Sequence, residues 1–306
     1  MTSFRNQLQE NVLDFTWSLW AELGVSGWQR HHTSHAIDPE LLVLFTAALG
    51  DADPRLRDES MDWSVTYGRY VSGTRLKNLL ETQTPAVQST FGEIAATVSA
   101  HSAARWPQRS KARRFERTGR SIIDDFLRPS LIVLRLRAFL GVGARAEIVR
   151  SFVADPSEKF TAADLAAETD YTKRNVAEAL EALRMAGLVQ AVPLRNQLQY
   201  RLTSSDVLAH LPGEMPHTFP RWRAIFRILG ALLEAAQRAE HLNATTRRVE
   251  ASDVLHALAP DLHALGLQSP LSDSRGRDSW AAFESWALAM SSAWASGQPH
   301  AAWRER

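Results

Sequence analysis

Hydrophobic residues recur at helical spacing through the first hundred residues of the chain. The first apolar stripe consists of Val12, Phe15, Leu19 and Leu23. Asp38 and Pro39 are the expected N-cap and first position of a second helix that ends at Gly50. Further helices are predicted at about 54–67, 75–80 and 85–100. Because strand-like alternation is absent, we predict an all-helical N-terminal domain over residues 1–104.

Residues 105–143 form a second segment with a different character. Cationic side chains gather between Arg105 and Arg120, with Glu116 as the one acid among them. Such a cluster can neutralise phosphates, and the alternative is a solvated linker or a helix face paired with acids elsewhere. The cluster lies shortly before the segment 144–205, described next, and this position favours phosphate contacts. The candidate residues are Arg109, Lys111, Arg113 and Arg114. Residues 129–140 then form a helix that is apolar almost all round, which is typical of burial between layers or between subunits.

The pattern changes again over residues 144–205, where three short helical stretches are followed by alternating residues. Thr161 and Thr172 are placed to cap the second and third helices, and Gly187 to end the third. The apolar face of the third helix consists of Val176, Ala179, Leu180 and Leu183. Apolar and polar residues then alternate on both sides of Arg195-Asn196-Gln197, which predicts a hairpin.

The order of three helices and a hairpin resembles the DNA-binding domain of bacterial winged helix-turn-helix regulators of the MarR and ArsR kind. The resemblance covers residues 144–203, about a fifth of the chain. It rests on three motifs, Tyr171–Val176, Ala179–Leu183 and Ala186–Val189.

The resemblance implies that the third helix enters the major groove of DNA with its first turn nearest the bases. Arg174 would then bind guanine and Asn175 adenine, while Thr172 and Lys173 contact phosphates. Arg195, with Asn196 beside it at the tip of the wing, would reach the minor groove. Lys159 and Thr161 would contact the sugar-phosphate backbone of the DNA. Two acids on the outward face, Glu178 and Glu181, oppose phosphate binding.

Residues 206–306 are expected to be helical, with helices at about 221–240, 252–265 and 278–296. The predicted fold class is therefore mainly α: a helical N-terminal region, a central winged helix-turn-helix with a small β-hairpin wing, and a helical C-terminal region. The apolar helices 129–140 and 221–240 flank the winged segment, and we expect one of them to form a homodimer interface.

Composition narrows the possible chemistry. The net charge of +1 gives no general affinity for nucleic acid, and the absence of cysteine excludes disulfides and thiolate catalysis. With no apolar leader at its N-terminus, the chain is expected in the cytoplasm. A cluster of His31, His32 and His35 suggests a metal site, but an exposed polar loop is the favoured interpretation. No catalytic or cofactor-binding motif is present, so we expect neither an enzyme nor a cofactor.

The predicted function is a transcriptional regulator, most simply a repressor that binds double-stranded DNA as a homodimer on a palindromic operator. One alternative is a helical protein-interaction protein, antitoxin-like or a scaffold, whose winged helix contacts protein. Another is an enzyme with its site in the aromatic N-terminal helices. Neither the operator, nor an effector, nor a protein partner is identified by the residues.

Overall fold

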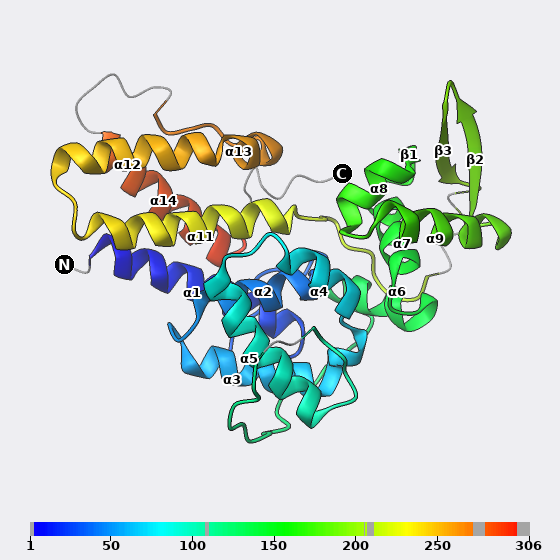
Figure 1. Ribbon diagram of the computed structural model, residues 1–306, viewed down its shortest axis with the longest axis horizontal. Coiled ribbons are helices and arrows are strands. Elements are labelled where there is room, and N and C mark those ends of the chain that lie inside the picture. The colour runs from blue at the N-terminus through cyan, green and yellow to red at the C-terminus, as the bar shows by residue number, and fades with distance from the viewer. Residues whose placement is uncertain (1–2, 108–109, 205, 207–210, 272–278, 299–306) are drawn as a thin grey trace. The chain divides into compact units, whose positions relative to one another are not determined.

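The computed structural model describes residues 3–107, 110–204, 206, 211–271 and 279–298. These residues are mainly helical, with one small three-stranded antiparallel sheet, which confirms the predicted fold class (Figure 1). The contacts divide the chain into two compact units. Of the described residues, the first unit takes in 3–22, 27–32, 220–271 and 279–298, and the second takes in 23–26, 33–107, 110–204, 206 and 211–219.

The first unit joins the two ends of the chain. Helix α1 (Phe4–Glu22) packs against α14 (Ser279–Ala295) and α11 (Trp222–Ala239), and α12 (Ala244–Ala257) and α13 (Ala259–Leu265) complete the unit. The rings of Phe15 and Trp222 lie 6.2 Å apart, and those of Phe15 and Trp294 lie 6.4 Å apart. The prediction of one N-terminal domain over 1–104 is corrected here, because the apolar side of α1 is buried among helices from the other end of the chain.

The apolar stripe of α11, one of the two predicted dimer helices, is used inside the first unit. Five members of the stripe are less than a tenth exposed, and Leu233 is half-buried; the five are Trp222, Ile225, Phe226, Leu229 and Leu232. Most of the apolar surface of α11 is therefore used within the first unit.

The histidine cluster lies in a loop, as predicted, but most of it is not exposed. His32 is fully buried in the first unit, where its Nδ1 lies 3.0 Å from the Ser18 hydroxyl and its Nε2 lies 2.9 Å from the carbonyl of Trp294. His35 is also buried, in the second unit, and only His31 is exposed. Within the described ranges, no three His, Asp or Glu side chains are grouped so that they could hold a metal ion.

The second unit begins with four helices: α2 (Pro39–Leu49), α3 (Pro54–Tyr67), α4 (Gly73–Leu80) and α5 (Pro85–His101), with a short 3-10 helix, η1 (Gly68–Tyr70), after α3. Each of the four starts at a polar N-cap whose side chain accepts from the first turn. These caps are Asp38, Asp53, Ser72 and Thr84, and the helices agree closely with the predicted ranges.

The other helices and strands of the second unit are η2 (Pro129–Leu131) and α6 (Ile132–Leu140), followed by the elements of the predicted winged segment. Those elements in order are α7 (Ala144–Ala154), β1 (Phe160–Thr161), α8 (Ala162–Thr169), α9 (Lys173–Met185), β2 (Val189–Leu194) and β3 (Gln197–Leu202). One core holds them together, and its fully buried members include Ile148, Phe152, Leu165, Val176 and Leu180. Since Ile132, Val133 and Leu136 belong to the same core, α6 is an integral part of this domain.

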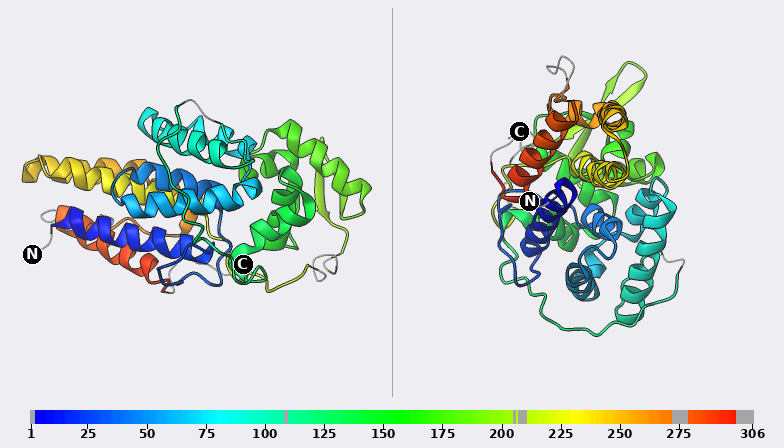
Figure 2. Two further views of the ribbon diagram at one scale, coloured as in Figure 1. Left: turned by 90° about the horizontal axis from the view of Figure 1, so that it is seen from below. Right: turned by 90° about the vertical axis from the view of Figure 1, so that its left-hand side faces the viewer.

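The predicted hairpin is confirmed. Strands β2 and β3 pair from Val189↔Leu202 to Leu194↔Gln197, which leaves Arg195 and Asn196 as the turn. Strand β1, not predicted from the sequence, adds to β3 and gives the sheet order β1-β3-β2. The wing projects from the neighbouring helices in Figure 1 and in the right-hand view of Figure 2. Across the described part of the chain, no helix has the length and apolar character needed to cross a membrane.

Candidate nucleic-acid interface

The first turn of α9 presents its polar residues outward. Thr172 caps the helix and accepts from the backbone N–H of Asn175 at 3.3 Å. The next three side chains, Lys173, Arg174 and Asn175, are exposed, whereas Val176 is completely buried. Because this turn also carries the positive end of the helix dipole, it is a favourable place for an anion. The expected orientation of the helix is therefore the observed one.

The acids on the outward face of α9 are each paired with an arginine of the same helix. Arg174 Nε lies 3.0 Å from a Glu178 carboxylate oxygen, and an Arg184 nitrogen lies 2.7 Å from Glu181. Pairing lowers the repulsion that these acids would exert on phosphate. Arg174 must leave Glu178 before it can contact DNA. The cost is small, because an exposed ion pair of this spacing stabilises a helix by only about 0.3–0.5 kcal/mol.

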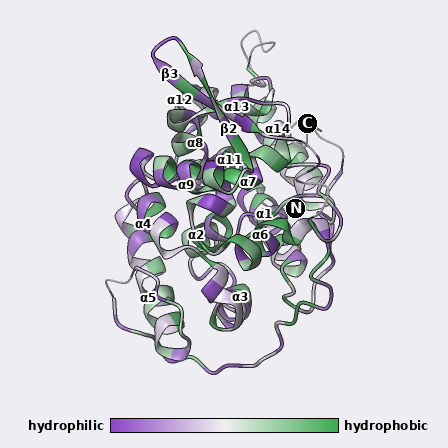
Figure 3. Cartoon of the chain, turned by 90° about the vertical axis from the view of Figure 1, so that its right-hand side faces the viewer, coloured by the Kyte–Doolittle hydropathy of each residue, from purple (hydrophilic) through white to green (hydrophobic). Residues whose placement is uncertain are grey.

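The wing beside α9 is cationic and partly apolar. Its charged residues are Arg195 at the turn and Arg201 on β3, both exposed, with no acid between Val189 and Leu202. Figure 3 shows hydrophilic residues at the tip of the hairpin. Below the tip, Val192, Leu194 and Leu198 are between 38% and 50% exposed. The wing therefore offers both charge and apolar surface to a partner.

The two predicted backbone contacts before α8 have different surroundings. Lys159 is exposed and precedes β1. Thr161 is half-buried and forms a capping box with Asp164, to which its hydroxyl donates at 2.7 Å. The Thr161 side chain is thus engaged in starting α8, and Lys159 is the freer of the two.

The basic segment is an irregular stretch between α5 and η2, away from the wing. The backbone N–H groups of Thr118, Gly119 and Ser121 donate to the buried Asp62 carboxylate. Trp106 is buried and stacks on Phe91. These anchors leave Lys111 and Arg114 exposed and Arg113 half-buried, while Arg109 lies outside the described residues. In Figure 1 the segment crosses the bottom of the view and the wing stands at the upper right, so the two predicted cationic groups are not brought together.

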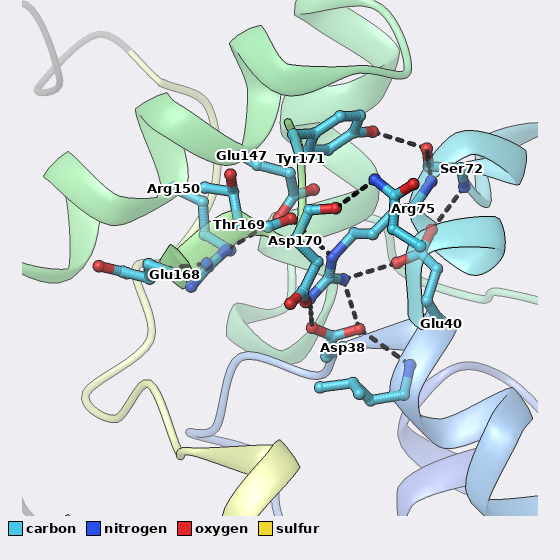
Figure 4. A network of polar contacts seen from close by, with 12 residues as sticks. Asp38, Glu40, Ser72, Arg75, Glu147, Arg150, Glu168, Thr169, Asp170 and Tyr171 are labelled. Carbon is cyan, nitrogen blue, oxygen red and sulfur yellow. Dashed lines mark hydrogen bonds and ion pairs between the residues drawn. The ribbon is translucent and has the colours of Figure 1, made fainter. Parts of the chain in front are cut away.

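A buried ionic network lies directly behind the helix-turn-helix (Figure 4). Arg75 of α4 is 2% exposed and contacts three carboxylates, those of Asp38 at 2.6 Å, Glu40 at 2.9 Å and Asp170 at 3.0 Å. Its Nε also donates to the carbonyl of Thr169 at 3.1 Å. Asp170 and Thr169 form the end of α8, so Arg75 holds the turn that precedes α9.

A second arginine extends this network along α6. Arg137 is 2% exposed and lies 2.7 Å from both Glu40 and Glu147. Glu147 in turn contacts Arg150 on α7 at 3.0 Å. The helices α2, α4, α6 and α7 are thereby tied to one another through charged groups that are removed from water.

The charges of the network are stabilised by their partners rather than by solvent. Burial alone would raise the pKa of the Glu147 carboxyl, but the Arg137 guanidinium more than offsets it, and the pKa falls to about 2. The same balance of burial against Arg75 lowers the pKa of Asp38. Both carboxylates therefore stay ionised at neutral pH.

Two further contacts from α4 reach the same turn. Asn78 donates its amide to the carbonyl of Asp170 at 2.8 Å, and the hydroxyls of Ser72 and Tyr171 lie 2.6 Å apart. None of these residues was predicted as part of the site, although the arginines within an otherwise apolar 129–140 helix were a signal. A charged residue at a buried position requires a buried partner.

Comparisons with known proteins add no further assignment. No protein-family model matches the chain significantly, and neither a curated protein nor a solved structure does.

Proposed function

We propose that this protein is a transcriptional regulator of the winged helix-turn-helix kind, which binds double-stranded DNA through α9 and the wing. The observation that carries the proposal is the first turn of α9, where Lys173, Arg174 and Asn175 are exposed beside a cationic hairpin. In such an arrangement the helix enters the major groove while the wing lies over the adjacent minor groove or backbone. The role is regulatory, not catalytic, and the cytoplasm is its compartment, since a chain without cysteine suits a reducing environment.

The contacts divide into two kinds. Arg174 and Asn175 read base edges, while Lys173, Lys159 and Arg195 neutralise phosphates or the minor groove. Asn175 keeps its amide N–H₂ for this purpose, because it is the Asn175 Oδ1 that accepts from the Thr172 hydroxyl. Lys111, Arg113 and Arg114 would act only on DNA that extends beyond α9, since their segment lies apart from the wing.

Binding to the DNA upstream of the protein's own gene tests the proposal. Fluorescence anisotropy is measured at about 50 and 200 mM salt, because phosphate contacts release counterions and weaken steeply with salt. Arg195→Ala is expected to reduce the slope of log affinity against log salt concentration by about one, the contribution of one phosphate contact. The matched control is Arg248→Ala, an exposed arginine on α12 of the first unit. Equal, salt-independent affinity for all fragments would reject the proposal.

A protein-interaction role is the second candidate, and the exposed apolar residues favour it. Met185 at the end of α9 is 78% exposed, and Leu194 and Leu198 on the wing are about half exposed. A protein partner would cover these side chains, whereas the phosphate backbone would not. In that case Leu198→Ser abolishes capture of the partner, while Arg174→Ala and Arg195→Ala leave it intact.

A further inference from the structure

A pocket of about 720 Å³ lies in the first unit, which has no part in the proposed DNA contacts. Its walls are α1, the loop 27–31 and the end of α14, and all of its lining residues belong to this one unit. Helices α1 and α14 lie side by side in both views of Figure 2. A volume between about 300 and 1,000 Å³ is usual for a site that binds a small molecule.

The walls of the pocket are fixed by hydrogen bonds and close packing. The backbone N–H of His31 donates to the Ser18 hydroxyl at 3.0 Å, and His32 Nε2 lies 2.9 Å from the carbonyl of Trp294. Gly297, just after α14, packs so closely against the carbonyl of His31 that no side chain would fit there. The loop is thereby held between α1 and α14, and the pocket exists before a ligand arrives.

Trp28 lines the pocket and is held in place by a second tryptophan. Its indole is 40% exposed and stacks on that of Trp17, with ring centroids 5.6 Å apart and an interplanar angle of 18°. Because Trp17 is only 2% exposed, the stack fixes the plane of the outer ring. One face of Trp28 is therefore covered, and the other is open to a ligand. The face of an indole attracts a cation that lies within about 6 Å of the ring centroid.

Two of the polar side chains in the pocket have only hydrogen-bond acceptors left. Asn11 Nδ2 donates to the Leu288 carbonyl at 3.4 Å and to the Ser291 hydroxyl at 3.0 Å, so the Oδ1 of Asn11 remains. The Ser296 hydroxyl donates to the carbonyl of Ser292 at 3.0 Å, so its oxygen lone pairs remain. A ligand that donates hydrogen bonds satisfies these atoms, whereas a ligand that only accepts them does not.

The pocket also contains a carboxylate that lacks a cationic partner. Asp14 lines the pocket, and none of the residues that the structure describes forms an ion pair with it. Partial burial, and then the charge of Glu10 one turn earlier on α1, raise the pKa of Asp14, and His31 opposes this only in part. The ionised Asp14 is thus less stable here than in water, and a bound cation would reverse that.

We propose that this pocket binds an organic cation, a protonated amine that carries an apolar group. The ammonium group lies between the Asp14 carboxylate and the open face of Trp28, and it donates to Asn11 Oδ1. An anion is repelled by Asp14 and Glu10, and a neutral molecule leaves the carboxylate without a counter-charge. The site does not rest on the proposed function, because the DNA contacts lie in the second unit.

Isothermal titration calorimetry of the full chain with benzylamine, which is a cation at neutral pH, tests the proposal. Benzyl alcohol has nearly the same shape without the charge, and benzoate carries the opposite charge. We expect benzylamine to bind with a dissociation constant of about 1 mM or below. The alcohol and the anion should each bind at least about tenfold more weakly.

Two substitutions separate the parts of the site. Asp14→Asn and Trp28→Ala should each weaken the binding of benzylamine at least about fivefold, and Trp28→Phe should recover part of the loss, because phenylalanine also attracts a cation. Asp253→Asn, at an exposed acid on α12 of the same unit, is the matched control and should bind as the wild type does. Circular dichroism checks the folding of each variant, and all three side chains are exposed.

Each outcome decides the matter. Equal affinity for benzylamine and benzyl alcohol would overturn the proposal, as would wild-type affinity in Asp14→Asn, because either result would mean that charge is not recognised. Absence of benzylamine binding at millimolar concentration would overturn it as well. Since no DNA is present in the experiment, these failures would leave the proposed function standing.

Discussion

The hydroxyl of Tyr171 lies 2.6 Å from the hydroxyl of Ser72, and each residue stands at the start of a helix. Ser72 is the N-cap of α4, and Tyr171 directly precedes Thr172, the N-cap of α9. The contact joins residues that are 99 positions apart in the chain. It ties the beginning of the proposed recognition helix to the helical part of the same unit, and it is buried.

Tyr171→Phe removes this hydrogen bond and leaves the ring in place. We expect a loss of about 1 kcal/mol in the free energy of unfolding, because the Ser72 hydroxyl is left in a buried site with one partner fewer. Hydrogen exchange in the first turn of α9 should also become faster. Tyr200→Phe, at a half-buried tyrosine of β3, is the control and should leave exchange in α9 unchanged.

Arg137→Met tests the buried network. Removal of this guanidinium leaves Glu40 and Glu147 as neighbouring buried charges, so we expect a loss of about 3–5 kcal/mol in urea unfolding. The exposed Arg145 of α7 provides the comparison, and Arg145→Met should change stability by less than about 0.5 kcal/mol. Addition of Glu147→Gln to Arg137→Met should cost less than the two single changes together, because the residues interact directly. Strict additivity would contradict the network.

The stability of the second unit should depend on pH through Glu147. Its pKa is about 2 in the folded protein and 4.5 for the free side chain, so the unfolded state takes up the proton first as pH falls. The contribution of the ionised carboxylate is present above about pH 4.5, is on the order of 3 kcal/mol, and is lost as the pH falls to about 2. Glu147→Gln should therefore be less stable than the wild type at pH 6, with the difference shrinking at pH 3.

Arg195 allows the structural and electrostatic roles of the wing turn to be separated. Its φ of 51° lies in the left-handed region, which asparagine adopts more readily. Arg195→Asn should keep or raise thermal stability while it weakens DNA binding, because the charge is lost. Arg195→Lys keeps the charge and should bind nearly as the wild type does. Equal binding by both variants would show that the charge at the tip has no role.

Much of the winged domain follows from local sequence. The apolar stripe of α9, the Thr161 capping box and the Gly187 helix end were all predicted, because each depends on residues within one turn or one helix. The exposed first turn of α9 follows directly from that stripe.

The ionic network and the division into units did not follow from the sequence. Arg137 and Glu40 are 97 positions apart, and charged residues within an apolar pattern give no indication of which acid they will meet. The pairing of α1 with α14 joins opposite ends of the chain. Likewise, Phe139 belonged to a stretch that is apolar almost all round, so its exposure could be seen only in the folded structure.

Removal of the ion pair between Arg174 and Glu178 is a further test of the proposed interface. Glu178→Gln removes the partner of Arg174 on α9, so we expect tighter binding to DNA and a steeper dependence on salt. Arg174→Ala should relax the preference for one base at a cost of about 1–3 kcal/mol in specific binding. If neither variant differs from the wild type in its affinity for DNA, this face of α9 does not contact DNA.

The central claim is that α9 lies in the major groove, and affinity cleavage measures this directly. Because the chain has no cysteine, Ala182→Cys on the exposed side of α9 can carry a single iron chelate that cuts nearby DNA. We predict cuts in two clusters about 10–10.5 base pairs apart or a multiple of that spacing, one from each copy of the helix. Cutting from Ala112→Cys in the basic segment, with none above background from Ala182→Cys on the same bound fragment, would contradict the account.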